Sequence, residues 1–402
     1  MKHFLQAVAE KFYEKEGVGI SDLCFVFPNR RSSLFFQRYL GMAAGKPIFS
    51  PRLLTINDLF VELSGYKIVD KVEALYILYQ HYAELMNWGD EKRESFDEFV
   101  YWGDILLGDF DDIDKYMVPA DKLFANIKEL QELDFGYDFL SQNQIDAIRL
   151  FWSGFLCGAD EPVKSGSIDK RGSFKKVWAI LYRLYSDFRS DLASRGLAYD
   201  GMIYRSIADA ILNGEGEPII EKLRSQYSQI VFVGQNALTK CEKVLCRALM
   251  KEDLADFYWD YYGDKVTDPD NKSSLFMKDN YNDFPSKYPL ERDAVTVSKS
   301  PELELVSVPS AVGQTSVVSS ILEEISHSGN FVPEETAIVL PDETLLTPML
   351  NAIPQSIGSV NVTMGIPMEG SNTDTFMKLL ERLQTGKRVK GEEIYFYHRT
   401  VI

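Results

Sequence analysis

The hydrophobic pattern at the start of the chain predicts a buried strand followed by a helix. The apolar run Leu23-Cys-Phe-Val-Phe27 ends at Pro28, as a buried strand does when a turn follows it. Asn29 is a suitable N-cap, and a helix is expected from Arg30 to about Leu40. A strand followed directly by a helix is the repeating unit of α/β proteins.

Further strand and helix signals repeat this alternation on both sides of a long helical stretch. A second strand is expected over residues 52–56, with a helix over 57–64 capped by Asn57. Strand signals return at 229–234 and 256–260, with a helix between them at about 239–250. The order predicts an α/β fold whose parallel sheet is interrupted by a helical insertion and then resumed.

The interrupting stretch, residues 67–228, has the period of amphipathic helices. Its aromatic residues are expected in a core, and a polar loop is expected at 158–174. One apolar stripe consists of Leu75, Leu78, Tyr82 and Leu85, and a second consists of Val177, Leu181, Leu184, Phe188 and Leu192. The tryptophans expected in the core are Trp88, Trp102, Trp152 and Trp178.

A second α/β unit is expected after residue 300. Residues 262–300 are rich in Asp, Asn, Ser, Lys and Pro, which indicates a linker or a long surface loop. The elements expected after it are strands at 303–308, 336–340 and 360–364 and helices at 314–326 and 343–352. The last residues, up to Ile402, carry no helix stop signal, so we expect the natural chain to continue.

The net charge of −17 argues against a protein that coats nucleic acid through bulk charge. The charge is unevenly distributed, because residues 90–161 hold 18 acidic and 6 basic side chains. Between Asp22 and Asp58 there is no acidic residue but five basic ones, which are Arg30, Arg31, Arg38, Lys46 and Arg52. This window could bind a polyanion although the chain as a whole is acidic.

Neither a disulfide framework, nor a metal site, nor a membrane span is expected. Four cysteines, Cys24, Cys157, Cys241 and Cys246, are scattered and are expected to be buried free thiols, as in a reducing cytoplasm. The four histidines are far apart, and no apolar run approaches a membrane span. The acidic stretch Asp109–Asp114 has some look of a calcium loop, but it lacks the glycine and the final glutamate, so a solvated turn or cap is expected.

The residues that a motor ATPase needs are missing. Such an enzyme binds phosphates with a Gly-rich loop followed by Lys and Ser/Thr. Gly41–Pro47 has the wrong spacing with proline in place of the hydroxyl, and Gly386-Lys-Arg388 also lacks the hydroxyl. The strand at 229–234 ends in the uncharged Gln235 and Asn236, where a metal-binding acid is needed. ATP hydrolysis is therefore not expected.

The junction Pro28-Asn29-Arg30-Arg31 is the strongest candidate for binding a ligand. A helix N-terminus offers free amides, and two arginines offer paired phosphate donors. From the chemistry alone, an ordinary surface turn with solvated arginines is an equally good interpretation.

Six segments, taken in order, carry a resemblance to a known family. They are Phe25-Val-Phe-Pro-Asn-Arg-Arg-Ser-Ser-Leu-Phe-Phe-Gln-Arg-Tyr-Leu40, Ser50-Pro-Arg-Leu-Leu-Thr-Ile-Asn-Asp-Leu-Phe60, 102–114, 231–240, 257–260 and Val362-Thr-Met-Gly-Ile-Pro367. The first two resemble the segments with which superfamily 1 helicases contact single-stranded DNA. Together the six are similar to AddB-like or RecB-like subunits of DNA-repair helicase–nucleases, and the similarity covers most of the chain.

The resemblance implies a RecA-like (P-loop NTPase-like) parallel sheet and particular roles for individual residues. Asn29, Arg30, Arg31 and Thr55 match DNA-facing positions, whereas Gln235 and Asn236 occupy the place of the ATPase acids and cannot replace them. It also implies a cytoplasmic double-strand-break repair protein that works with an AddA-like motor subunit. A PD-(D/E)XK exonuclease domain, with Mg and frequently an iron–sulfur cluster, would lie beyond Ile402. No catalytic residue or cofactor is expected within residues 1–402.

The expected domains are a helicase-like α/β domain at 1–66 and 229–262, the helical insertion at 67–228, the linker at 263–300 and the start of a second α/β domain at 301–402. The expected function is that of an ATPase-dead, helicase-like module that binds single-stranded DNA. Two alternatives stay open: a protein-interaction scaffold that docks a partner through its acidic helices without DNA contact, and an enzyme of the nucleotide-sugar kind.

Overall fold

The structure of the chain is a computed structural model that divides into two compact units, residues 1–299 and 300–402. It describes residues 3–86, 94–124, 170–260, 271–272, 275–290, 302–329, 331–365, 368, 371–391 and 393–398, with only the backbone of 170–179 and of 334. Predictions for Trp88, Trp152, Cys157, the side chains of Val177 and Trp178, most of the loop at 158–174 and most of the acidic stretch at 90–161 fall outside these residues.

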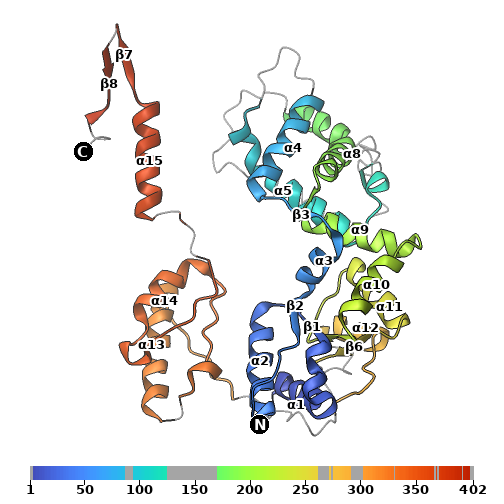
Figure 1. The fold of residues 1–402 in the computed structure, drawn as a ribbon. Coiled ribbons are helices and arrows are strands. Elements are labelled where there is room, and N and C mark those ends of the chain that lie inside the picture. Colours follow the sequence, from blue (N-terminus) through green and yellow to red (C-terminus); the bar gives the residue numbers. More distant parts are fainter. Residues whose placement is uncertain are drawn as a thin grey trace. The chain divides into compact units, whose positions relative to one another are not determined.

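The first unit is built on a four-stranded parallel sheet (Figure 1), which confirms the predicted α/β class. The strands follow the order β2-β1-β5-β6, so β1 and β5 form its centre. Their bounds are β1 Leu23–Phe27, β2 Arg52–Thr55, β5 Gln229–Val233 and β6 Ala255–Tyr258. In the register, Phe27 lies opposite Thr55, and Leu23 lies opposite Gln229.

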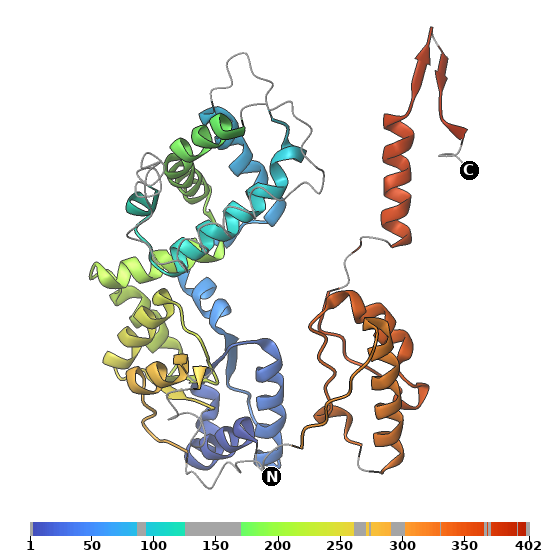
Figure 2. The ribbon, with the colours of Figure 1, turned by 180° about the vertical axis from the view of Figure 1, so that it is seen from behind.

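Helices cover both faces of this sheet, which explains why β1 is apolar at every position. Phe25 and Phe27 pack with α1 (Phe4–Glu16) and α2 (Arg30–Ala44), whereas Cys24 and Val26 belong to the larger core on the opposite face. Figures 1 and 2 show α2 on one side of the sheet and α10 to α12 on the other.

A block of helices connects β2 with β5, and its apolar stripes face inward as predicted. Leu181, Leu184, Phe188 and Leu192 are all buried. The described elements of this block are α3 (Ile56–Ser64), β3 (Lys67–Ile68), α4 (Lys71–Leu85), α5 (Phe96–Lys115), α8 (Lys170–Ser194), β4 (Leu197–Ala198), α9 (Asp200–Leu212) and α10 (Glu217–Gln226). The short strands β3 and β4 pair in parallel.

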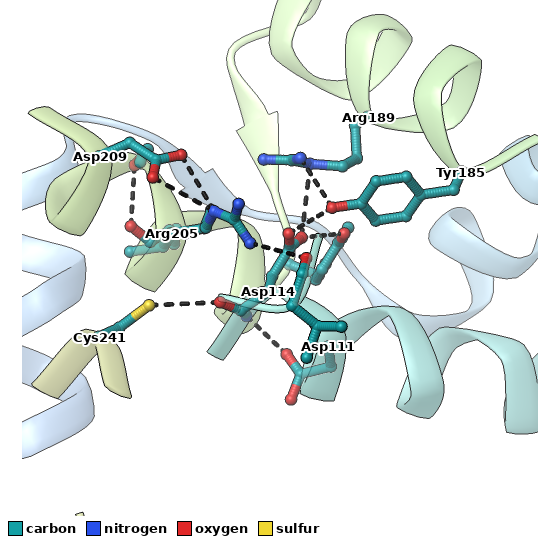
Figure 3. A network of polar contacts seen from close by, with 12 residues as sticks. Asp111, Asp114, Tyr185, Arg189, Arg205, Asp209 and Cys241 are labelled. Carbon is teal, nitrogen blue, oxygen red and sulfur yellow. Dashed lines mark hydrogen bonds and ion pairs between the residues drawn. The ribbon is translucent and has the colours of Figure 1, made fainter. Parts of the chain in front are cut away.

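A buried polar network joins the helices of this block to the helix that follows β5 (Figure 3). Asp114, which is fully buried on α5, accepts hydrogen bonds from the hydroxyls of Tyr185 and Tyr199, both at 2.5 Å, and lies 3.4 Å from Nε of Arg189. Its backbone carbonyl accepts a hydrogen bond from Sγ of Cys241 at 3.3 Å. Burial raises the pKa of Asp114, and the charge of Arg189 partly opposes that rise.

The segment after β6 differs from the predicted linker. α11 (Lys240–Lys251) leads to β6, and α12 (Leu275–Asp283) then forms inside the stretch 262–300. Nε1 of Trp259 donates a hydrogen bond to the carbonyl of Phe284 at 2.8 Å, and Phe284 is buried in the core. This part of the stretch therefore belongs to the first unit, because a buried aromatic residue anchors it.

The second unit, residues 300–402, contains the two predicted helices but not the predicted strands. Its described elements are α13 (Ala311–His327), η5 (Pro333–Glu335), η6 (Glu343–Leu345), α14 (Leu346–Ala352), η7 (Gln355–Ile357), α15 (Asn372–Thr385) and a hairpin of β7 (Arg388–Lys390) with β8 (Glu393–Tyr395). No strand is assigned at 303–308, 336–340 or 360–364, which are described throughout. Alternating apolar residues favour an extended backbone, but a strand also needs a paired neighbour, and these segments have none among the described residues.

Among the helices that the structure describes, none combines the length and the apolar character needed to cross a lipid bilayer.

Candidate nucleic-acid interface at the carboxyl edge of the sheet

The carboxyl edge of the sheet has a topological switch point between its two central strands. β1 continues into α2, which covers the face lined by Phe25, whereas β5 continues into α11, which covers the opposite face. Neighbouring parallel strands whose connections leave to opposite faces create a crevice outside their carboxyl ends, where α/β proteins bind ligands. The loops that follow β1 and β5 therefore form the best candidate site in the first unit.

The loop after β1 places the three predicted residues Asn29, Arg30 and Arg31 at the start of α2. Oδ1 of Asn29 accepts a hydrogen bond from the amide of Ser32 at 2.9 Å, so Asn29 is the N-cap, as predicted. Both arginines are exposed, and a guanidinium nitrogen of Arg30 lies 3.6 Å from Oδ1 of Asp58. Within the described residues Arg31 has no ion-pair partner, so its charge is free to bind an anion.

The adjacent strand β2 brings Thr55 to the same edge, but its hydroxyl is already hydrogen-bonded. It donates to Oδ2 of Asp58 at 2.7 Å and accepts from the amide of Asp58 at 3.1 Å, which completes a capping box. The predicted cap at Asn57 is therefore wrong, because α3 begins at Ile56. Thr55 fixes the edge locally, and its hydroxyl has little remaining capacity for a ligand.

The sequence did not single out Asp58, although Thr55 and Asp58 have the spacing of a capping box and could have been recognised by it. Burial raises the pKa of Asp58, but the hydrogen bonds from Thr55 and the charge of Arg30 outweigh it, so the pKa is lowered overall. A carboxylate that stays ionised keeps Arg30 near the two helix N-termini.

The loop after β5, on the neighbouring strand of this edge, carries uncharged groups. Gly234 has a φ of 68°, a left-handed conformation that glycine adopts without strain. The turn directs the buried Gln235 back toward β1, where its Nε2 donates a hydrogen bond to the carbonyl of Val26 at 3.2 Å. The backbone carbonyl of Asn236 accepts a hydrogen bond from Nδ2 of Asn280. Both predicted residues thus lie at the switch point, where they hold the loop in place.

Asn280 was not identified from the sequence, because it comes from α12, far along the chain. It is buried, and among the described residues its Oδ1 has no hydrogen-bond partner. It therefore leaves one unused acceptor beside the loop that follows β5.

The glycine-containing stretch at 41–47 lies at the wrong end of its helix for binding phosphate. It covers the last residues of α2 and the following connection, and Gly45 is the C-cap. A phosphate-binding loop must precede a helix, because the N-terminal amides and the positive end of the dipole attract the anion. Gly386 likewise follows the end of α15.

Other titratable groups in the described residues do not form a reactive or metal-binding centre. Cys24, Cys241 and Cys246 are buried and free, and burial raises the pKa of Cys24 and of Cys241 to about 12, so these thiols stay protonated. The stretch Asp109–Asp114 lies inside α5 rather than in a loop. No group of three or more His, Cys, Asp or Glu in the described ranges is placed to hold a metal ion.

No family model matches this chain, and no curated protein matches it.

Proposed function

We propose that the first unit binds the phosphate backbone of single-stranded DNA at the carboxyl edge of its sheet and that it hydrolyses no nucleotide. The observation that supports this best is the position of Arg30 and Arg31 at a helix N-terminus beside the topological switch point. Free amides and a positive dipole end favour an anion there, and guanidinium groups add paired donors for phosphate oxygens.

The loop after β5 offers no carboxylate where a nucleotide-hydrolysing enzyme needs one to hold its metal ion. β5 is followed by Gly234, Gln235 and Asn236, none of which can hold a metal ion through a carboxylate. A helicase binds its DNA strand and its nucleotide in different places, so the loss of one site is compatible with keeping the other. We therefore interpret the unit as a RecA-like sheet with a large inserted helical domain, in an ATPase-dead member of the helicase-like proteins.

On this proposal the chain is the DNA-binding, helicase-like portion of a double-strand-break repair subunit similar to AddB. An AddA-like motor partner and a PD-(D/E)XK nuclease domain are further expectations that depend on the sequence resemblance alone.

The test is fluorescence anisotropy with a labelled oligothymidylate over a range of salt concentrations. For Arg30→Ala/Arg31→Ala we expect affinity to fall about tenfold at low salt and the slope of log K against log salt to shrink by about 1.4, since each lost phosphate contact on a single strand removes about 0.7.

The matched control is Arg183→Ala/Arg224→Ala, which removes two exposed arginines from α8 and α10. An equal loss in the control would mean that binding is bulk charge attraction and not a site. If the unaltered protein bound no DNA at low salt, the scaffold interpretation would replace this one.

A further inference from the structure

The outer face of α2 carries a line of exposed basic and apolar side chains that the fold does not use. Arg31, Leu34, Arg38 and Met42 follow one another at helical spacing, and all four are exposed. Leu34 is 65% exposed and Met42 is 66% exposed. This line runs from the carboxyl edge of the sheet toward its opposite edge, because α2 returns the chain from the end of β1 to the start of β2.

The buried face of the same helix shows that these residues are not needed for packing. Phe36 and Leu40 fill the core next to the sheet, and Phe36 lies 4.5 Å from Phe25 between ring centroids. The connection after α2 also has one partly buried and one exposed apolar side chain. Ile48 packs against this core, whereas the adjacent Phe49 is 87% exposed. A large aromatic ring thus stands in solvent in the connection that follows α2.

The charged side chains along this line, and Lys46 just after α2, are all positive. Arg31, Arg38 and Lys46 are exposed and have no ion-pair partner in the described parts of the chain, in contrast to Arg52, which is paired with Glu62. The chain as a whole has a net charge of −17, so a line of side chains with only positive charges is a local exception. Such a surface is complementary to a polyanion.

We propose that a single-stranded nucleic acid bound at the carboxyl edge continues along the outer face of α2, with its bases against Leu34, Met42 and Phe49. The inference rests on the proposed function and extends it to a second set of contacts. Single-strand sites combine cations for the phosphates with apolar and aromatic surfaces for the bases, whose faces a duplex would hide. The 15 residues of α2 span about 22 Å, enough for on the order of four nucleotides.

A second copy of the chain is a poorer occupant of this face. In a two-fold symmetric contact the same patch faces itself, which would place Arg31 and Arg38 opposite the same arginines of the other copy. Like charges without intervening carboxylates would oppose that contact. The charge pattern therefore favours a polyanion over self-association.

The experiment compares oligothymidylates of about 5 and about 12 nucleotides, and a 12-nucleotide strand with abasic sites, by anisotropy at low salt. For Arg38→Ala/Phe49→Ala we expect about a tenfold loss of affinity for the longer strand and less than about a twofold loss for the shorter one. Phe49→Ala alone should reduce the preference for thymidylate over the abasic strand, and Leu34→Ala/Met42→Ala/Phe49→Ala should remove it. All of these side chains are exposed, and circular dichroism checks that the variants fold.

The matched control is Tyr182→Ala/Arg183→Ala, an exposed aromatic–arginine pair on α8. One outcome would refute the path along α2 and leave the proposed function intact. In that outcome Arg38→Ala/Phe49→Ala binds the longer strand with unchanged affinity, while Arg30→Ala/Arg31→Ala loses affinity for both strand lengths. Failure of the unaltered protein to bind either length would refute both. Self-association in light scattering that Leu34→Ser/Met42→Ser abolishes would instead identify the face as a contact between copies.

Discussion

At the scale of single residues, the environment of each charged group decides what it can do. Arg30 has a carboxylate of Asp58 3.6 Å away, whereas Arg31 has no such partner among the described residues. An exposed ion pair contributes little to stability, so Arg30 can exchange Asp58 for a phosphate at small cost. The sequence predicted where these residues lie, since caps are local signals, but not the pairing with Asp58, which comes from the next strand–helix connection.

Asp109 on α5 provides a pH-dependent prediction. Burial, and then the charge of Asp112, raise its pKa from 3.8 to about 6. A raised pKa in the folded state means that its contribution to stability is complete below about pH 4 and is lost as pH rises through 6. Asp109→Asn should therefore raise the free energy of unfolding at pH 7.5 by about 1 kcal/mol, less than the full shift because the carboxyl is partly exposed.

The measurement is urea unfolding of the variant and of the unaltered protein at pH 4.5 and at pH 7.5. The gain in the free energy of unfolding should be larger at pH 7.5. Asp121→Asn, at an exposed carboxylate, is the control and should change little at either value. A gain that does not depend on pH would mean that the charge of Asp109 is not its cause.

At the scale of elements, local sequence signals identified the helices better than they identified strand ends. Asn57 and Thr55 can both cap a helix, and the pairing of Thr55 with Phe27 extends β2 to Thr55, so the helix begins directly after it. The sequence pattern of this segment does not predict that Thr55 pairs with Phe27, so it cannot predict where β2 ends. The same limit applies to residues 303–308, where apolar residues predict an extended backbone but cannot supply a neighbouring strand.

The capping box of α3 is expected to carry a measurable part of the stability of this edge. Thr55→Ala should lower the free energy of unfolding by about 1 kcal/mol, and Asp58→Ala by a similar amount. Since both residues belong to one hydrogen-bonded unit, the double variant should lose less than the sum of the single losses.

Chemical denaturation of the three variants gives this coupling directly. Ser206→Ala is a suitable control, because its hydroxyl only returns to the carbonyl of Ile203 within α9. Additive losses would show that Thr55 and Asp58 act separately.

At the scale of the whole first unit, long-range contacts determine the architecture, and these were the least predictable from the sequence. The parallel class followed from the alternation of strands and helices, but the central pairing of β1 with β5 joins segments about 200 residues apart. The Asp114 network is similar, because its groups come from α5, α8, α11 and the start of α9. No local sequence pattern marks these residues as partners, because only the fold brings them into contact.

Asp114→Ala should weaken the connection between the helical block and the sheet. It leaves the hydroxyls of Tyr185 and Tyr199 without their acceptor and removes the carboxyl group that faces Arg189, so we expect a loss of about 3 kcal/mol in the free energy of unfolding. Asp187→Ala breaks an exposed pair with Arg183 on the same helix, α8, and should cost less than about 1 kcal/mol. Equal losses in equilibrium unfolding would contradict a structural role for the buried network.

The pairing of β1 with β5 has a consequence for when this edge of the sheet can form. The two strands are synthesised far apart in time, with the whole helical block between them, so a nascent chain that ends before β5 lacks the switch point. Closing so long a loop is a slow and late step of folding. A ligand that contacts the loops after both strands would therefore bind only a chain whose synthesis has passed β5.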